Sequence, residues 1–186
     1  MTIRFTIPTY LTLLRIALIP LLAIVFYLPW DYSKLACTSI FLVAGLTDWL
    51  DGYLARKMDM QTAFGAFLDP VADKLMVAFV LVLLVQAEAN PYLAIPAAVI
   101  IGREIAIASL REWMAEIGQR AKVKVSQLGK WKTTAQMAAI SLLLYRDDLF
   151  GLPINSMGYW LLYLSAVLTL WSMVNYLVAA FSTIKE

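Results

Sequence analysis

Four aspartates at helical spacing are the residues of this sequence best placed to do chemistry. Asp48 and Asp51 are three residues apart, and Asp69 and Asp73 are four residues apart, so each pair lies on one face of a helix. Carboxylates that converge in space repel one another. A divalent cation relieves that repulsion, and ligation by oxygen alone suits Mg²⁺ or Mn²⁺. The four aspartates therefore predict a metal-dependent site.

Small residues beside these aspartates add a second signal. Gly52 follows Asp51 directly, and Gly65 lies four residues before Asp69. Glycine inside a helix costs about 1 kcal/mol relative to alanine, so its presence there indicates that something bulky approaches the backbone. Asp51-Gly52 alone would be ordinary in a turn, and Asp69-Pro70 alone at the start of a helix. Together with all four carboxylates they predict a binding site.

The composition excludes several other kinds of catalyst. The chain of 186 residues is 62% hydrophobic and 15% charged, whereas an average soluble domain is about 25% charged. It has no histidine and a single cysteine, Cys37, which excludes His-based triads, zinc sites built on His or Cys clusters, and a disulfide framework. The net charge of +2 does not support a surface that binds nucleic acid. Chemistry here depends on carboxylates, lysine, arginine, hydroxyls and metal ions.

Six hydrophobic segments must position these residues. They cover residues 8–28, 35–56, 66–87, 91–115, 128–145 and 153–182. A spanning helix needs about 20 residues, so six spans leave no room for a separate soluble domain, and we expect one membrane domain over residues 1–186. Lysine and arginine gather in the connections on one side, which predicts that both termini face the cytoplasm. The expected fold is an all-α integral membrane protein with six transmembrane helices.

Charged residues enter the first five segments and avoid the sixth. Arg15 lies in the first segment, the aspartates lie in the second and third, and further basic residues lie in the fourth and fifth. Under the expected topology all of them lie towards the cytoplasmic half of the membrane. Ionisable residues inside a bilayer cost at least about 2.5–3.5 kcal/mol each, and they normally face an interior cavity. This pattern predicts a polar active-site cavity that opens to the cytoplasm.

The acidic residues and their small neighbours form one continuous motif. It reads Asp48-x2-Asp51-Gly52-x2-Ala55-Arg56-x8-Gly65-x3-Asp69-x3-Asp73. This motif resembles the complete signature of the CDP-alcohol phosphotransferase family, with eight specified positions at fixed spacing. The resemblance implies a homodimer of six-helix subunits, with two Mg²⁺ or Mn²⁺ ions per active site held against the diphosphate of a CDP-linked substrate.

The resemblance also implies roles for individual residues. Asp48, Asp51, Asp69 and Asp73 would hold the metal ions, and Asp73 would act as the catalytic general base. Contacts to CDP-diacylglycerol would come from Gly52, Ala55, Arg56, Gly65 and Thr9. Thr9 belongs to a segment, residues 7–15, that is similar to the family's first helix, although asparagine is more usual at its position.

Basic residues at the cytoplasmic ends of the fourth and fifth segments bear on the choice of acceptor alcohol. They are Arg103, Arg111, Lys130 and Lys132. A phosphorylated alcohol would be held there by charge-assisted hydrogen bonds, whereas an uncharged acceptor would gain nothing from them. An ordinary band of positive charge on the cytoplasmic side, or ion pairs with Glu104, Glu112 and Glu116, would also account for these residues.

The segments around these basic residues narrow the resemblance. Residues 103–105, 110–115 and 129–136 are similar to the bacterial phosphatidylglycerophosphate synthases, one branch of the family. This implies that CDP-diacylglycerol reacts with sn-glycerol 3-phosphate at the cytoplasmic face of a bacterial inner membrane, giving phosphatidylglycerophosphate and CMP. The alternatives are a phosphatidylinositol phosphate or phosphatidylserine synthase, a noncatalytic scaffold, which would leave the carboxylates unexplained, and a divalent-cation transporter. A transporter would place its ligands near the bilayer midplane.

Overall fold

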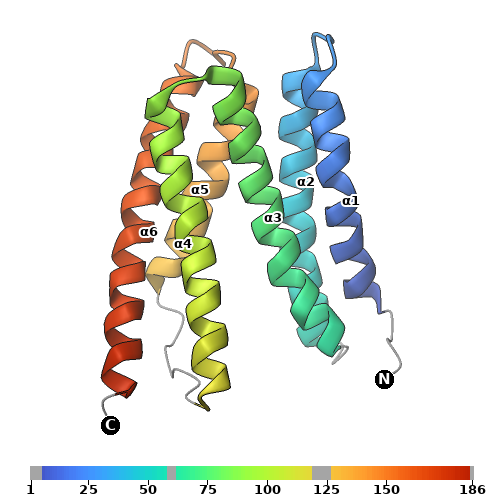
Figure 1. Ribbon diagram of the computed structural model, residues 1–186. Helices are drawn as coiled ribbons and strands as arrows, with labels where there is room; N and C mark the ends of the chain where they lie inside the picture. Colours follow the sequence, from blue (N-terminus) through green and yellow to red (C-terminus); the bar gives the residue numbers. More distant parts are fainter. Residues whose placement is uncertain (1–5, 58–61, 119–126, 185–186) are drawn as a thin grey trace. The chain divides into compact units, whose positions relative to one another are not determined.

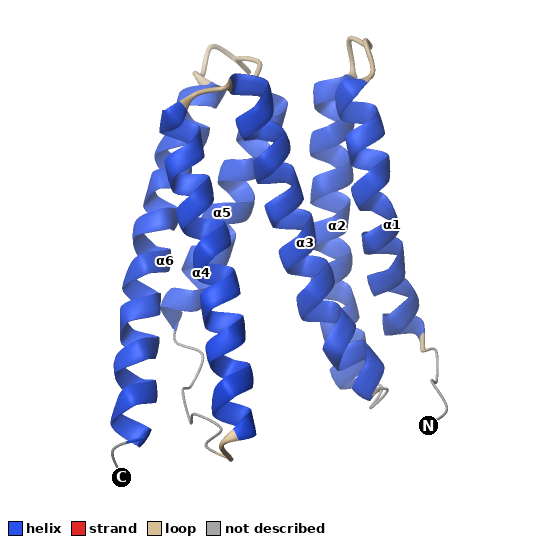
Figure 2. Ribbon diagram, viewed as in Figure 1, coloured by secondary structure: helices blue, strands red, loops and turns tan. Residues whose placement is uncertain are grey.

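The protein is a set of six α-helices in the computed structural model, which describes residues 6–57, 62–118 and 127–184 (Figure 1). The helices are α1 (Ile7–Tyr27), α2 (Ser33–Lys57), α3 (Ala63–Glu88), α4 (Pro91–Glu116), α5 (Gln127–Tyr145) and α6 (Ile154–Ile184). Regular structure in the described ranges is otherwise limited to an isolated bridge between Leu149 and Leu152. Figure 2 accordingly shows helices joined by loops. The all-α prediction is confirmed, with one helix for each expected segment.

The largest difference from the expected boundaries is at the start of α3. The apolar pattern predicts a start at residue 66, whereas the helix begins at Ala63. Thr62 is the cause, because its Oγ1 atom accepts a hydrogen bond from the backbone N–H of Gly65 at 3.0 Å. A threonine that accepts such a bond caps a helix N-terminus and satisfies one of its open donors. Gly65 therefore lies inside the first turn of α3, close to the acidic residues.

Asn90 and Pro91 define the start of α4. The side chain of Asn90 accepts a hydrogen bond from the backbone N–H of Tyr92, and Pro91 occupies the first turn, where its missing N–H costs nothing. The connection from α3 to α4 is consequently short, and Ala89 within it has a positive φ of 46°.

The described chain falls into two compact units. Unit 1 comprises Met1–Leu84 and Ser141–Asn155, and unit 2 comprises Val85–Ile140 and Ser156–Glu186. Each unit has its own buried apolar residues, among them Leu22, Phe41 and Val80 in unit 1 and Ile100 and Leu162 in unit 2. The expectation of a single domain over residues 1–186 stays a prediction.

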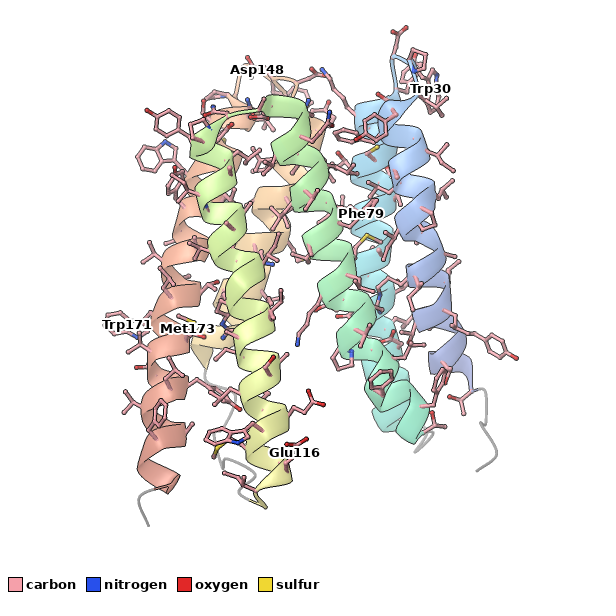
Figure 3. All side chains as sticks on the ribbon, viewed as in Figure 1. Trp30, Phe79, Glu116, Asp148, Trp171 and Met173 are labelled. Carbon is pink, nitrogen blue, oxygen red and sulfur yellow. The ribbon has the colours of Figure 1, made fainter. Side chains whose placement is uncertain are left out.

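Many large apolar side chains point away from the protein. On α6, Trp160, Val167, Trp171 and Val178 are all more than half exposed, and their spacing places them on one face of the helix. Figure 3 shows Trp171 projecting outward from α6. Polar Thr169 on the same helix is fully buried, which is the reverse of the pattern in a soluble helix. This arrangement suits a lipid environment.

Three of the six helices are long and apolar enough to cross a membrane. The candidate spans are Thr9–Tyr27, Pro91–Glu116 and Ile154–Phe181. Helices α2, α3 and α5 do not qualify within the described residues, and α2 and α3 carry the acidic motif. The membrane character expected from the sequence is thus supported for half of the helices by length and composition.

Candidate active site

The acidic residues of the motif occupy the end of α2 and the beginning of α3, both in unit 1. Asp48 and Asp51 lie on the last three turns of α2, whereas Asp69 and Asp73 lie in the first half of α3. Their surroundings differ, because Asp51 is only 2% exposed whereas the side chain of Asp48 is 43% exposed. A buried carboxylate requires partners, and for Asp51 one of them comes from α1.

Arg15 on α1 joins the two aspartates of α2. Its Nη1 atom donates to Oδ1 of Asp48 at 2.7 Å, and its Nη2 atom donates to Oδ2 of Asp51 at 2.6 Å. The Arg15 side chain is 1% exposed, so this fork is buried at its centre. A cation of the protein itself therefore offsets part of the carboxylate repulsion, which on the sequence alone is attributed wholly to a metal ion.

Thr12, one turn before Arg15, makes the corresponding contact with α3. Its Oγ1 atom donates to Oδ1 of Asp69 at 2.5 Å, and Thr12 is fully buried. Thr12 and Arg15 lie on adjacent turns of α1 and on the same face of the helix. This face of α1 therefore contacts acidic residues of both α2 and α3. Neither Thr12 nor Arg15 is among the site residues predicted from the sequence.

Thr9 and Gly65, both predicted to contact CDP-diacylglycerol, lie close together. A Cβ atom added to Gly65 would lie 3.5 Å from Oγ1 of Thr9 and 3.1 Å from Oγ1 of Thr62. Thr9 is 1% exposed, and its hydroxyl is 3.1 Å from that of Thr6. Position 65 therefore lies next to the Thr9 hydroxyl of α1, and a side chain there would crowd the Thr62 hydroxyl.

Three predicted donor contacts, Gly52, Ala55 and Arg56, lie within α2, and one predicted acceptor contact, Lys130, lies within α5. The surroundings of these four residues lie outside the described part of the structure. Asp73 is described, half-buried on α3, one turn beyond Asp69.

The donor chemistry of the acidic residues fits a hard divalent cation. Carboxylate oxygens are the ligands that Mg²⁺ and Mn²⁺ prefer. In the structure, the Arg15 guanidinium is the cation that lies between the carboxylates of Asp48 and Asp51. Among the described residues, no three acidic, histidine or cysteine side chains converge closely enough to surround an ion. The structure thus brings Asp48 and Asp51 together around Arg15 and places Asp69 separately against Thr12.

Two of the four predicted acceptor-binding residues meet in unit 2. Lys132 Nζ on α5 donates to Oε1 of Glu104 on α4 at 2.5 Å, and Arg103 Nη1 donates to the same oxygen at 3.0 Å. Arg103 Nη2 also donates to Oγ of Ser172 on α6 at 2.5 Å. The three charged side chains are between 7% and 23% exposed. Two cations share one carboxylate, so these three side chains together carry a net charge of +1.

The Arg103 guanidinium in this cluster retains unused donor capacity. Its Nε atom is buried and has no hydrogen-bond partner within the described part of the chain. A buried donor without a partner is costly, and an anion is the partner that would satisfy it best in a cluster with excess positive charge.

Arg111, the third described residue of the predicted acceptor set, has a different environment. Its Nε atom donates to the hydroxyl of Tyr176 on α6 at 3.1 Å, and its guanidinium lies 5.2 Å from the centre of the same ring. It is exposed, two turns beyond Arg103 on α4. Arg111 therefore does not share the ion pairs of the Arg103–Glu104–Lys132 cluster.

Comparisons with known proteins identify the family. Residues 5–171 match the model of the CDP-alcohol phosphatidyltransferase family. A protein of Haemophilus influenzae named CDP-diacylglycerol–glycerol-3-phosphate 3-phosphatidyltransferase is 53% identical over 177 residues, which cover 95% of this chain and 94% of the relative. Proteins of the same name from Pectobacterium atrosepticum and Escherichia coli are 53% and 52% identical over 95% of this chain and 96% of their own length. The chain therefore belongs to the CDP-alcohol phosphatidyltransferase family.

Proposed function

We infer that this chain transfers the phosphatidyl group of CDP-diacylglycerol to sn-glycerol 3-phosphate, giving phosphatidylglycerophosphate and CMP. The observation that carries this conclusion is the identity of 52–53%, over 95% of the chain, with bacterial proteins named for that reaction. An aligned region of that length includes both the acidic residues and the basic cluster. Membership in a family of transferases also excludes the transporter and the noncatalytic scaffold as alternatives.

We assign Mg²⁺ or Mn²⁺, two ions per active site, to Asp48, Asp51, Asp69 and Asp73. The oxygen donors of the four carboxylates support this assignment. When bound, the ions neutralise the diphosphate and stabilise the charge that develops on departing CMP. The donor is held by Thr9 and Gly65, which lie side by side, together with Gly52, Ala55 and Arg56.

The reaction itself is a displacement at the phosphorus that carries the diacylglycerol. The primary hydroxyl of glycerol 3-phosphate forms a new P–O bond there, while the P–O bond to CMP breaks and CMP leaves with the bonding electron pair. Asp73 accepts the proton of the attacking hydroxyl, which makes it the general base. Its place one turn from Asp69 supports this role.

The acceptor phosphate is bound by the basic residues Arg103, Arg111, Lys130 and Lys132. The strongest support comes from Arg103 and Lys132, because they share one carboxylate and retain an excess positive charge. Arg103 Nε is also buried and has no hydrogen-bond partner among the residues that the structure describes. A phosphate dianion meets both needs through charge-assisted hydrogen bonds.

We place the protein in the inner membrane of a bacterium, as a homodimer with six spans per subunit, both termini in the cytoplasm and the active-site cavity open to the cytoplasm. The outward apolar residues of α6 and the three candidate spans support the membrane location. The distribution of lysine and arginine supports the orientation. Both the water-soluble acceptor and the lipid donor can reach a site at the boundary between the membrane and the cytoplasm.

The test is release of CMP by the purified full-length protein from CDP-diacylglycerol in lipid nanodiscs. We expect release with sn-glycerol 3-phosphate and Mg²⁺ or Mn²⁺, and none with serine, inositol 1-phosphate or no acceptor. Addition of a chelator should stop the reaction, and restoring the metal should restart it. A preference for serine or inositol 1-phosphate would refute the assigned acceptor, whereas full activity in chelator would refute the assigned metal.

A further inference from the structure

Helix α1 carries a buried polar face that the acidic motif does not include. Thr9, Thr12 and Arg15 recur at intervals of three residues and are no more than 1% exposed, although α1 is otherwise apolar. Burying polar side chains costs free energy unless they form hydrogen bonds, so these three residues need partners. For Thr12 and Arg15 these partners are carboxylates of α2 and α3.

The bonds from Arg15 restrict the orientation of two carboxylates at once. Each of its two terminal nitrogens contacts a different aspartate, at 2.7 and 2.6 Å, so rotating either carboxylate breaks a short charge-assisted bond. Arg15 is buried, and its guanidinium has a planar, rigid fork of donors. Lysine carries the same charge but lacks that fork, so it cannot impose the same geometry.

Thr12 restricts the third carboxylate in the same way. It donates to one oxygen of Asp69 at 2.5 Å. A carboxylate offers about four acceptor positions on its two oxygens, so a bond to α1 is compatible with metal ligation by the same group. Metal sites are commonly built in this manner, with outer side chains that orient the ligands.

We propose that Thr12 and Arg15 are positioning residues, which orient Asp48, Asp51 and Asp69 for the metal ions without touching the substrates. The proposal rests on the proposed function in one respect, namely that these aspartates bind the metal. In the opposite role for Arg15, its guanidinium competes with the metal for the carboxylates. The two roles predict opposite changes in metal affinity when the guanidinium fork is removed.

The experiment measures Mn²⁺ binding to the purified full-length protein in nanodiscs by titration calorimetry, without substrates. The variants are Arg15→Lys, which keeps the charge and loses the fork, Thr12→Val, which loses the hydroxyl, and Thr12→Ser, which restores it. Thr38→Val is the matched control, because Thr38 is a buried threonine that bonds only the backbone oxygen of Lys34 among the described contacts.

We expect Arg15→Lys and Thr12→Val to raise the Kd for Mn²⁺ about 10–100-fold, which is the usual effect of losing a side chain that orients a metal ligand. Thr12→Ser should stay within a few-fold of the wild type, and Thr38→Val should leave the Kd unchanged. Saturating Mn²⁺ should restore most of the turnover of both affected variants, since the catalytic groups themselves are intact.

Several results would overturn the proposal. An unchanged Kd in Arg15→Lys and Thr12→Val would reduce α1 to a structural role, and a lower Kd in Arg15→Lys would make Arg15 a competitor of the metal. Equal weakening in Thr38→Val would indicate general destabilisation. If Arg15→Lys does not fold, the comparison of Thr12→Val with Thr12→Ser decides alone. A wild-type protein that binds no Mn²⁺ would refute the proposed metal site as well, which separates that failure from failure of the positioning role alone.

Discussion

Replacing Lys132 by methionine tests whether the basic cluster of unit 2 binds the acceptor phosphate. Lys132 and Arg103 share the carboxylate of Glu104, so the cluster carries one net positive charge, and Lys132→Met leaves it neutral. Methionine keeps the apolar stem that packs in this buried position. The phosphate then loses a charge-assisted bond, which is worth about 1.5–3 kcal/mol.

This loss corresponds to an increase of about 10–100-fold in the KM for glycerol 3-phosphate, because about 1.4 kcal/mol is a factor of ten. The kcat should change little, since the phosphate is bound equally in the ground state and in the transition state. The KM for CDP-diacylglycerol should also change little. The assay is release of CMP at varied concentrations of each substrate in turn.

A double variant separates net charge from the individual contact. In Lys132→Met with Glu104→Gln, the remaining Arg103 restores the net charge of +1 without restoring the lysine. Recovery of most of the lost affinity would indicate that net charge decides, whereas no recovery would indicate a direct bond from Lys132. Lys34→Met is the matched control, because Lys34 is an exposed lysine that pairs with Asp147 in unit 1. If Lys132→Met behaves like Lys34→Met, the reasoning that assigns the phosphate to this cluster is wrong.

Three further predictions concern the reaction, the donor and the topology. Asp73→Asn should lower kcat by about 10²–10⁴ while CDP-diacylglycerol still binds, as expected for loss of a general base; near-normal turnover would exclude that role. Gly65→Ala should raise the KM for CDP-diacylglycerol and change the Tm little. The Tm stays nearly constant because alanine gains about 1 kcal/mol of helix propensity, which offsets a weakened Thr62 cap of similar size. A large fall in Tm with a normal KM would show that Gly65 serves packing instead. In a Cys37→Ser background, a cysteine at Asp148 should react with an impermeant maleimide in intact cells and one at Gly118 should not; the reverse labelling would invert the orientation.

The helices were predictable because their boundaries are encoded locally. Apolar runs of spanning length end at strong local signals, such as Pro29 after α1 and Asn90-Pro91 before α4. The start of α3 is the exception, because Thr62 caps the helix and extends it. The cap depends on a hydrogen bond from the N–H of Gly65, which exists only once the first turn has formed. An N-terminal threonine before an apolar helix was the signal that could have found it.

The acidic site was predictable in its residues and less so in its partners. Spacing within one helix relates Asp48 to Asp51, but it carries no information on which side chain of another helix lies opposite them. The sequence identifies Arg15 only as a charge inside a span, because its partners follow from tertiary packing. The recurrence of Thr9, Thr12 and Arg15 at intervals of three was the available signal. Likewise, the basic residues were found from their charge, whereas the sharing of Glu104 required the structure.

The buried fork of Arg15 also bears on how the chain enters the membrane during synthesis. Translation proceeds at about 5–20 residues per second, so Asp51 is made about 2–7 s after Arg15. Until then α1 would carry an uncompensated cation, at a cost of about 2.5–3.5 kcal/mol in the bilayer. Insertion of α1 and α2 together, as a hairpin with the ion pairs already formed, avoids that cost. Insertion assays on chains stalled before and after Asp51 would measure this order. If α1 inserts only after Asp51 is made, the first helix depends on the second for its place in the membrane.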